Sequence, residues 1–189
     1  RSEAERAMLE DVMCYVIFGL CNGLRGEEVP LISLRGLLHY WEETASAASP
    51  FIMTTLYGKF KGEIDERWHC LPIPDRTRTG IPARKLIGQG MHRRVVLEGR
   101  RAGPFFQVKG TKGEDRRARI SDYDEEFRRL IAKAKARFPK VFLEDADPEM
   151  FSLWRSMRRG ATLETTGRVS DEIIKLYQRW RSVEASKAG

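Results

Sequence analysis

The chain has 189 residues, 41% of them hydrophobic and 32% charged, which is typical of a globular protein and excludes an intrinsically disordered chain. Its formal net charge of +7 and pI near 9.5 indicate a polyanionic partner. No apolar run approaches the length of a membrane span, and three cysteines without zinc-type spacing predict a reduced, intracellular protein, nuclear in a eukaryote and in the cytoplasm or nucleoid of a bacterium. The length predicts one domain over residues 1–189.

The N-terminal stretch is expected to be helical. Residues 2–18 place apolar side chains along one face, and Gly19 and Gly23 are expected to end the helix. A short helix, interrupted early by Pro30, is predicted over residues 27–34.

Two runs rich in β-favouring residues follow, over 51–57 and 67–74. An acidic, glycine-containing segment separates them, so the prediction is a β-hairpin whose tip covers residues 58–66. Lys59 and Lys61 lie in that tip, where most lysines are ordinary surface groups. The histidines have no partner pattern and are interpreted as structural or surface groups: His39, His69 and His92.

The middle of the chain carries most of the positive charge. Residues 76–119 contain 13 lysines and arginines against three acidic residues, a net +10, which predicts a basic surface region rather than evenly spread charge. Within this window, residues 81–97 are expected to be helical and residues 99–119 to form a basic loop anchored by Phe105 and Phe106.

The C-terminal part is predicted to begin with a helix that starts at Ser121, its expected N-cap, and closes at Pro139. The sequence Asp147-Pro148-Glu149 is a helix-start signature. It leads into residues 154–182.

Residues 154–182 combine a basic segment with an amphipathic one. Arg155 and Arg158 are three residues apart, so on a helix they share a face and could both reach one anion. Ser170 is expected to cap a second helix, whose apolar residues recur at helical spacing: Ile173, Ile174, Tyr177 and Trp180. Taken alone, this pattern is typical of an exposed basic helix packed on an amphipathic one.

Three motifs occur in this chain in the order that one protein family shows. The first is glycine-leucine-arginine-x-x-glutamate, matched by Gly23, Leu24, Arg25 and Glu28. The second is a hairpin that carries a lysine. The third is an arginine followed by small residues and, after a short helix, by a histidine or tryptophan, matched by Arg158, Gly160, Ala161, Thr162 and Trp180. With these motifs the chain resembles the catalytic domain of the tyrosine recombinases, the phage-integrase family, over nearly all of its length.

The resemblance implies an α+β fold, mainly α-helical, with a small antiparallel β-sheet. It implies that Arg25 and Arg158 bind a DNA phosphate, where always-charged guanidinium groups stabilise the negative charge that develops on the non-bridging oxygens. Lys59, with Lys61 as second choice, would be the general acid, and Trp180 would pack the site and donate its indole N–H to the phosphate. Because a 3′-phosphotyrosyl link conserves the bond energy, no metal and no cofactor are expected.

Two positions depart from the family pattern. Arg155 occupies the place of the family's histidine, and an arginine can bind phosphate but cannot act as a base. No tyrosine follows Trp180, so the nucleophile is expected outside this chain, as is the DNA-clamping domain that usually precedes the catalytic one. Tyr177 is a poor substitute, because it precedes Trp180 and occupies an apolar helix position.

The predicted function is that of a site-specific recombinase or mobile-element integrase, which cleaves and rejoins double-stranded DNA as a dimer or tetramer. Type IB topoisomerases share this chemistry and remain a related alternative. Two functions outside this chemistry also stay open: a recombinase-derived module that binds DNA without catalysis, and a basic helical RNA- or ribosome-binding protein. The RNA-binding function predicts scattered rather than convergent positions for the motif residues: Arg25, Lys59, Arg158 and Trp180.

Overall fold

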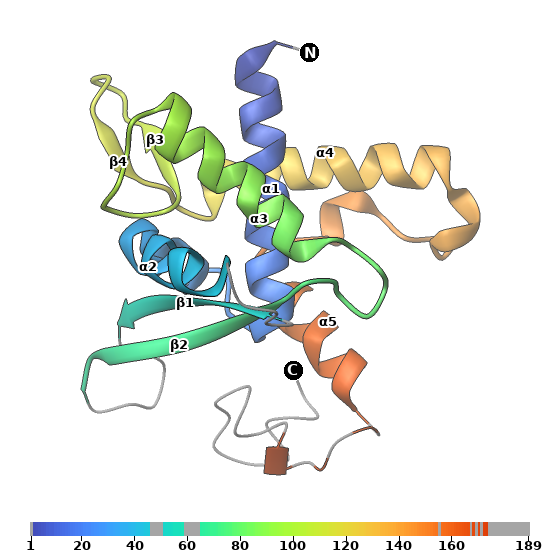
Figure 1. Cartoon of the computed structure of the whole chain (residues 1–189). Coiled ribbons are helices and arrows are strands. Elements are labelled where there is room, and N and C mark those ends of the chain that lie inside the picture. The colour runs from blue at the N-terminus through green and yellow to red at the C-terminus, as the bar shows by residue number, and fades with distance from the viewer. Residues whose placement is uncertain are drawn as a thin grey trace.

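The computed structural model describes residues 2–45, 51–58, 65–154, 156–166, 168, 170 and 172–173. It is an α+β architecture, mainly helical, as the sequence predicts, with two small antiparallel sheets among the described residues (Figure 1). The main elements are α1 (Glu3–Asn22), α2 (Leu34–Ala45), β1 (Phe51–Gly58), β2 (Arg67–Pro74), α3 (Ala83–His92), β3 (Gln107–Lys109), β4 (Asp115–Arg117), α4 (Ser121–Arg137) and α5 (Ser156–Thr165). Single turns of 3₁₀-helix cover Val29–Leu31, Pro139–Val141 and Pro148–Met150, and a π-helical turn covers Arg93–Leu97.

Helix α1 begins at a capping box and is longer than predicted. The Ser2 hydroxyl accepts from the Glu5 N–H at 3.2 Å, and the Glu5 carboxylate accepts from the Ser2 N–H at 2.9 Å. The helix ends at Gly23, whose φ of 55° is left-handed. The prediction that Gly19 ends it is wrong. Gly19 lies inside the helix, where a Cβ would come within 2.8 Å of Met157 of α5.

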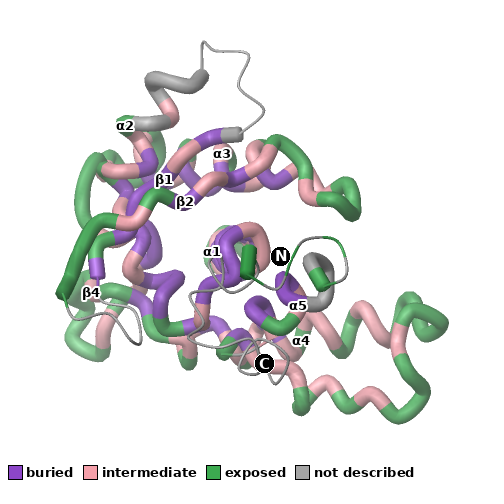
Figure 2. The backbone as a smooth tube through the Cα atoms, turned by 90° about the horizontal axis from the view of Figure 1, so that it is seen from below, coloured by how far each residue is buried: buried purple, intermediate pink, exposed green. Residues whose placement is uncertain are grey.

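The core surrounds α1, which is seen almost end-on in the middle of the molecule in Figure 2. Helices α3, α4 and α5 and strand β2 all pack on it. Its aromatic side chains meet Phe105 and Phe106, which are fully buried, with ring centroids 5.3 Å apart for Tyr15 and Phe106 and 5.5 Å apart for Phe18 and Phe105. The anchoring role predicted for the phenylalanines is therefore confirmed, although residues 107–117 form the β3–β4 hairpin and not a plain loop.

The predicted hairpin forms between β1 and β2, in a register that pairs Phe51 with Pro74 and Gly58 with Arg67. Helix α2, which the sequence pattern did not predict, packs on β1. The approach is close at Gly36, where a Cβ would lie 1.9 Å from the Thr55 hydroxyl oxygen. Only a glycine lets helix and strand come this near.

A charged cluster is buried between α1, the end of α3 and α4. The Asp11 carboxylate accepts from Arg94 at 2.5 Å, from Arg93 and, at 3.3 Å, from the Tyr123 hydroxyl. Arg94 is 1% exposed, donates to the Phe105 carbonyl at 2.6 Å, and stacks 3.8 Å from the centre of the Phe105 ring. Burial raises the pKa of the Asp11 carboxyl, and the charges of Arg94 and Arg93 partly offset this rise.

The basic window does not form one surface. Its first part is the loop between β2 and α3, and its last part is the β3–β4 hairpin, which lies near the opposite end of α3 (Figure 1). Between them, Arg93 and Arg94 hold Asp11, and Arg100 pairs with Glu98 at 3.3 Å. A single basic region is therefore the wrong expectation, because local acidic groups neutralise the centre of the window.

Helix α4 and the segment after it, residues 138–151, project away from α1 as an arm (Figure 1). Ser121 does not cap α4 with its side chain; the N-cap position is Ile120, and Asp122 accepts from the Arg119 N–H at 2.6 Å. The Asp147-Pro148-Glu149 signature starts one 3₁₀ turn, whereas α5 begins only at Ser156. The arm exposes four large apolar side chains: Phe138, Val141, Leu143 and Met150. None of the helices within the described part of the chain combines the length and apolar character needed to cross a membrane.

Candidate functional site

The first arginine motif lies on the turn that follows α1. The left-handed Gly23 ends the helix, and Leu24 is fully buried beneath the turn. The Glu28 carboxylate, 4% exposed, accepts from the Arg25 backbone N–H at 2.7 Å and from Arg25 Nη1 at 3.1 Å. This pair fixes the turn and the direction of the guanidinium together, while 23% of the Arg25 side chain stays exposed.

The second arginine motif lies on α5, whose inner face packs on α1. Met157 reaches Gly19, and a Cβ on Gly160 would lie 3.1 Å from Leu20. Arg158 is 7% exposed, whereas its neighbour Arg159 is exposed. Because burial removes water from a guanidinium, an anion that reaches Arg158 would interact with it more strongly than at the surface.

The turn that carries Arg25 meets the segment before α5 at Gly26. Its N–H donates to the Trp154 carbonyl at 3.2 Å, and its own carbonyl accepts from the Tyr15 hydroxyl in the core. A Cβ on Gly26 would lie 2.7 Å from the Leu153 carbonyl oxygen and 2.9 Å from Trp154 Cα. The structure therefore brings the turn that carries Arg25 into backbone contact with the segment that leads into α5.

This junction gives a test of the local geometry. Gly26→Ala should destabilise the fold by about 1–3 kcal/mol, because the new methyl group meets backbone atoms that have no room to move. Urea unfolding measures the loss. Gly160→Ala is the matched control, since its methyl meets only the flexible end of Leu20 and alanine favours a helix. Equal stability for Gly26→Ala and the wild type would contradict the close approach.

Four predicted site residues lie outside the described residues, and the structure does not place them: Lys59, Lys61, Arg155 and Trp180. The same holds for Tyr177. For Lys59 and Lys61 the structure gives only the flanking strand ends, Gly58 and Arg67.

Two of the tyrosines with described side chains are unsuited to nucleophilic attack. Tyr15 and Tyr123 are fully buried, and their hydroxyl groups donate to Gly26 and Asp11. Burial raises the pKa of both phenols far above its usual value. Neither can provide a phenolate to a DNA phosphate.

A hollow of about 550 Å³ adjoins the junction. Glu27 and Leu31 line it from the first motif, Trp154 from the segment before α5, and Arg117 and Arg119 from the chain after β3. Both arginines are exposed. The sequence places both arginines in the basic window, but no sequence pattern predicts that they line this hollow. Their location depends on how the start of α4 packs.

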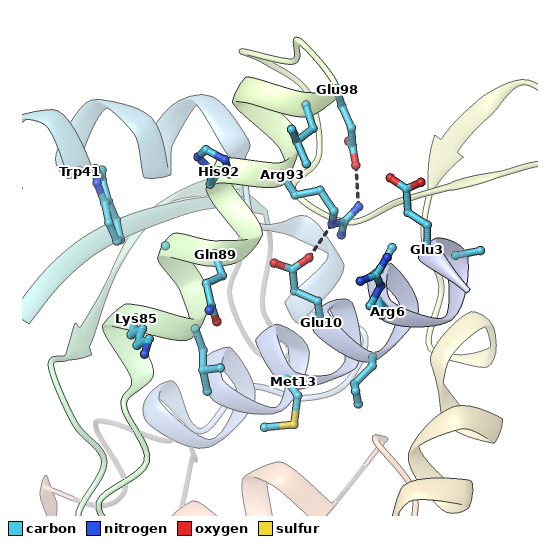
Figure 3. A pocket seen from close by; sticks show the side chains of 16 residues that line it. Glu3, Arg6, Glu10, Met13, Trp41, Lys85, Gln89, His92, Arg93 and Glu98 are labelled. Carbon is cyan, nitrogen blue, oxygen red and sulfur yellow. Dashed lines mark hydrogen bonds and ion pairs between the residues drawn. The ribbon is translucent and has the colours of Figure 1, made fainter. Parts of the chain in front are cut away.

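A larger hollow of about 1150 Å³ lies between α1 and α3, as Figure 3 shows. Arg93 is its central cation, but Glu10 and Glu98 hold it at 2.7 and 2.5 Å. This arrangement neutralises Arg93 and does not favour phosphate binding. Within the part of the chain that the structure describes, no group of three or more metal-binding side chains occurs.

Among solved structures, the fold matches those of the Tn1549 transposon integrase. In the complex with transposon right-end DNA the TM-score is 0.54 at 12% identity, and in a complex with circular intermediate DNA it is 0.54 at 13% identity. Each match covers all of this chain and 60% of the other chain. The chain has an integrase-like fold. The fold expected from the resemblance is thereby confirmed, although neither the protein-family models nor the curated proteins give a match. In this integrase-like fold, the turn after α1 and the segment before α5 are the segments that meet at Gly26.

Proposed function

We propose that this chain is a DNA-binding, recombinase-like domain in which Arg25 and Arg158 hold one DNA phosphate. The observation that carries the proposal is the junction at Gly26, which joins the turn that carries Arg25 to Trp154, in the segment before α5, although the two lie near opposite ends of the sequence. An integrase-like fold supports it, because the Tn1549 transposon integrase, which has a similar fold, was solved in complex with DNA.

In the proposed reaction a tyrosine attacks the phosphodiester, forms a 3′-phosphotyrosyl link and releases a 5′-hydroxyl. Arg25, directed by Glu28, and Arg158 stabilise the charge on the non-bridging oxygens. Lys59, or second Lys61, protonates the departing oxygen, and Trp180 donates to the phosphate. Arg155 adds a further cation but no proton exchange, so this domain binds phosphate better than it moves protons.

Double-stranded DNA is the proposed partner, and its affinity should depend steeply on salt. A surface that makes about six phosphate contacts loses roughly a thousandfold in affinity between about 50 and about 200 mM salt. Arg117→Ala with Arg119→Ala, beside the junction, should weaken binding to any duplex sequence and lower the salt slope by about two. Fluorescence anisotropy with a labelled duplex measures both effects.

The matched control removes the same charge from the arm, by Lys133→Ala with Lys140→Ala. Both lysines are exposed, and the arm projects away from the junction (Figure 1). We expect the control to keep the wild-type slope. Affinity that stays flat with salt in the wild type would remove nucleic acid as the main partner, and tighter binding to duplex RNA than to duplex DNA would favour an RNA-binding protein.

A DNA-binding module without catalysis is the second candidate function. Arg155 in place of a histidine favours it, because the site then lacks a group that exchanges protons near neutral pH. Self-association on DNA, as a dimer or tetramer, belongs to the recombinase proposal and can be measured by sedimentation of the protein–DNA complex. Covalent trapping, described in the Discussion, separates the two candidates.

A further inference from the structure

An exposed aromatic pair lies at the outer end of the β1–β2 hairpin. Tyr57 and Trp68 face each other across the two strands, with ring centroids 5.1 Å apart and ring planes at 55°. Tyr57 is 46% exposed and Trp68 is 62% exposed. Most of the indole surface is thus left outside the packing of the protein, which is unusual for so large an apolar group.

The position of the pair follows from how the hairpin is covered. Strand residues that point inward, such as Leu56 and Leu71, are buried, and α2 covers the outward face as far as Thr55. Tyr57 and Trp68 come next along the strands, beyond that contact. They form a ledge that the described part of the chain leaves exposed.

This ledge lies one residue pair from the Gly58–Arg67 end of the hairpin, where the sequence continues into the proposed general acid, Lys59. The chain that leaves Arg25 pairs with β1 through the Ile32–Leu56 bridge, and a Cβ on Gly58 would lie 3.1 Å from Leu31. Because Lys59 follows Tyr57 by two residues, DNA that Lys59 contacts under the proposed function would pass close to the aromatic pair.

The charge near the ledge shows what kind of contact it can offer. Residues 57–69 contain three basic side chains, Lys59, Lys61 and Arg67, and three acidic ones, Glu63, Asp65 and Glu66. This balance gives no net attraction for phosphate groups. The aromatic faces remain, and every nucleobase has a π-face that stacks on such a ring without regard to sequence.

We propose that Tyr57 and Trp68 form a stacking platform for a nucleobase that has left the duplex. The inference rests on the proposed function, and it names a base contact separate from the phosphate contacts of Arg25 and Arg158. Bases inside a duplex have both faces covered by their neighbours, so only an unpaired base can stack on a side chain. Exchange of DNA strands requires the end of a cut strand to unpair, and the platform holds such a base beside the cut.

The test compares two DNA probes in fluorescence anisotropy: a fully paired duplex, and the same duplex with a short run of central unpaired bases. One stacked base is expected to give the wild type roughly tenfold tighter binding to the unpaired probe. Trp68→Ala should abolish that preference and leave duplex affinity unchanged, and Tyr57→Ala should reduce it. Because stacking releases no counterions, the preference should be the same at low and moderate salt.

Phe138→Ala is the matched control, an exposed aromatic of the arm that should leave both affinities unchanged. Thermal melting of each variant checks that the fold is intact, as expected for side chains this exposed. Equal wild-type affinity for the two probes, or a preference that survives Trp68→Ala, overturns the platform and leaves DNA binding standing. Failure of the wild type to bind either probe overturns the proposed function, and the platform with it.

Discussion

Asp11→Ala should lower the free energy of unfolding by about 3–5 kcal/mol, more than any other substitution proposed for this protein. It leaves the buried guanidinium of Arg94 without its counter-charge. Arg94 is 1% exposed and cannot reach water in the folded state. The same change removes the acceptor of the Tyr123 hydroxyl and one acceptor of Arg93. Urea denaturation of the variant and the wild type measures the difference in unfolding free energy.

The matched control for this cluster is Glu98→Ala. Glu98 also pairs with Arg93, at 2.5 Å, but its side chain is 33% exposed, so we expect a loss of only about 0–1 kcal/mol. A similar small loss for Asp11→Ala would show that the cluster is hydrated, contrary to the burial seen here.

The second large effect concerns covalent chemistry. On a nicked suicide substrate, residues 1–189 should bind DNA and form no covalent adduct, because no tyrosine follows Trp180. If the parent protein continues beyond Gly189 with a tyrosine, the longer chain should form the adduct. In that chain Arg158→Ala should lower the rate by about 10²–10³, the usual loss when one donor to a transition-state oxyanion is removed.

Arg159→Ala is the matched control, since Arg159 is the next residue of the same helix and is exposed. It should leave the trapping rate close to that of the wild type. A longer chain that has the tyrosine, binds DNA and forms no adduct would establish the binding module. An adduct formed by residues 1–189 alone would contradict our expectation, and Tyr177→Phe would then identify its source.

Local pattern was enough to predict much of the fold. The β-favouring runs gave both strands of the β1–β2 hairpin, and the period of the helix after Ser121 gave α4. Helix α2 was not predicted, although Leu34, Leu37 and Trp41 recur at helical spacing around Gly36. The structural reason for a glycine at this position is its close contact with Thr55 of β1. A helical pattern in the sequence cannot predict that contact.

In the candidate site, too, local patterns predict some features and miss those that depend on distant contacts. Motif order selected Arg25 and Arg158 as candidates, and the structure pairs Arg25 with Glu28 of the same motif. No local signal could show that Gly26 supports Trp154, or that Arg94 is buried while Arg117 and Arg119 reach the junction. These features depend on contacts between residues far apart in the sequence, and a single sequence does not encode them as a pattern.

The contact between Gly26 and Trp154 has a consequence for biosynthesis. It joins the first turn after α1 to a residue near the far end of the described chain, and the Asp11–Tyr123 contact spans 112 positions. Such distant pairings slow folding, because chain entropy is lost before the contacts form. The ribosome must deliver the chain through residue 123 before the aromatic side chains of α1 can pack on Phe105, Phe106 and Tyr123, and through residue 154 before the Gly26 contact can form. A shorter nascent chain displays part of this surface to solvent. A chain truncated before residue 154 is therefore expected to aggregate more readily than the folded domain.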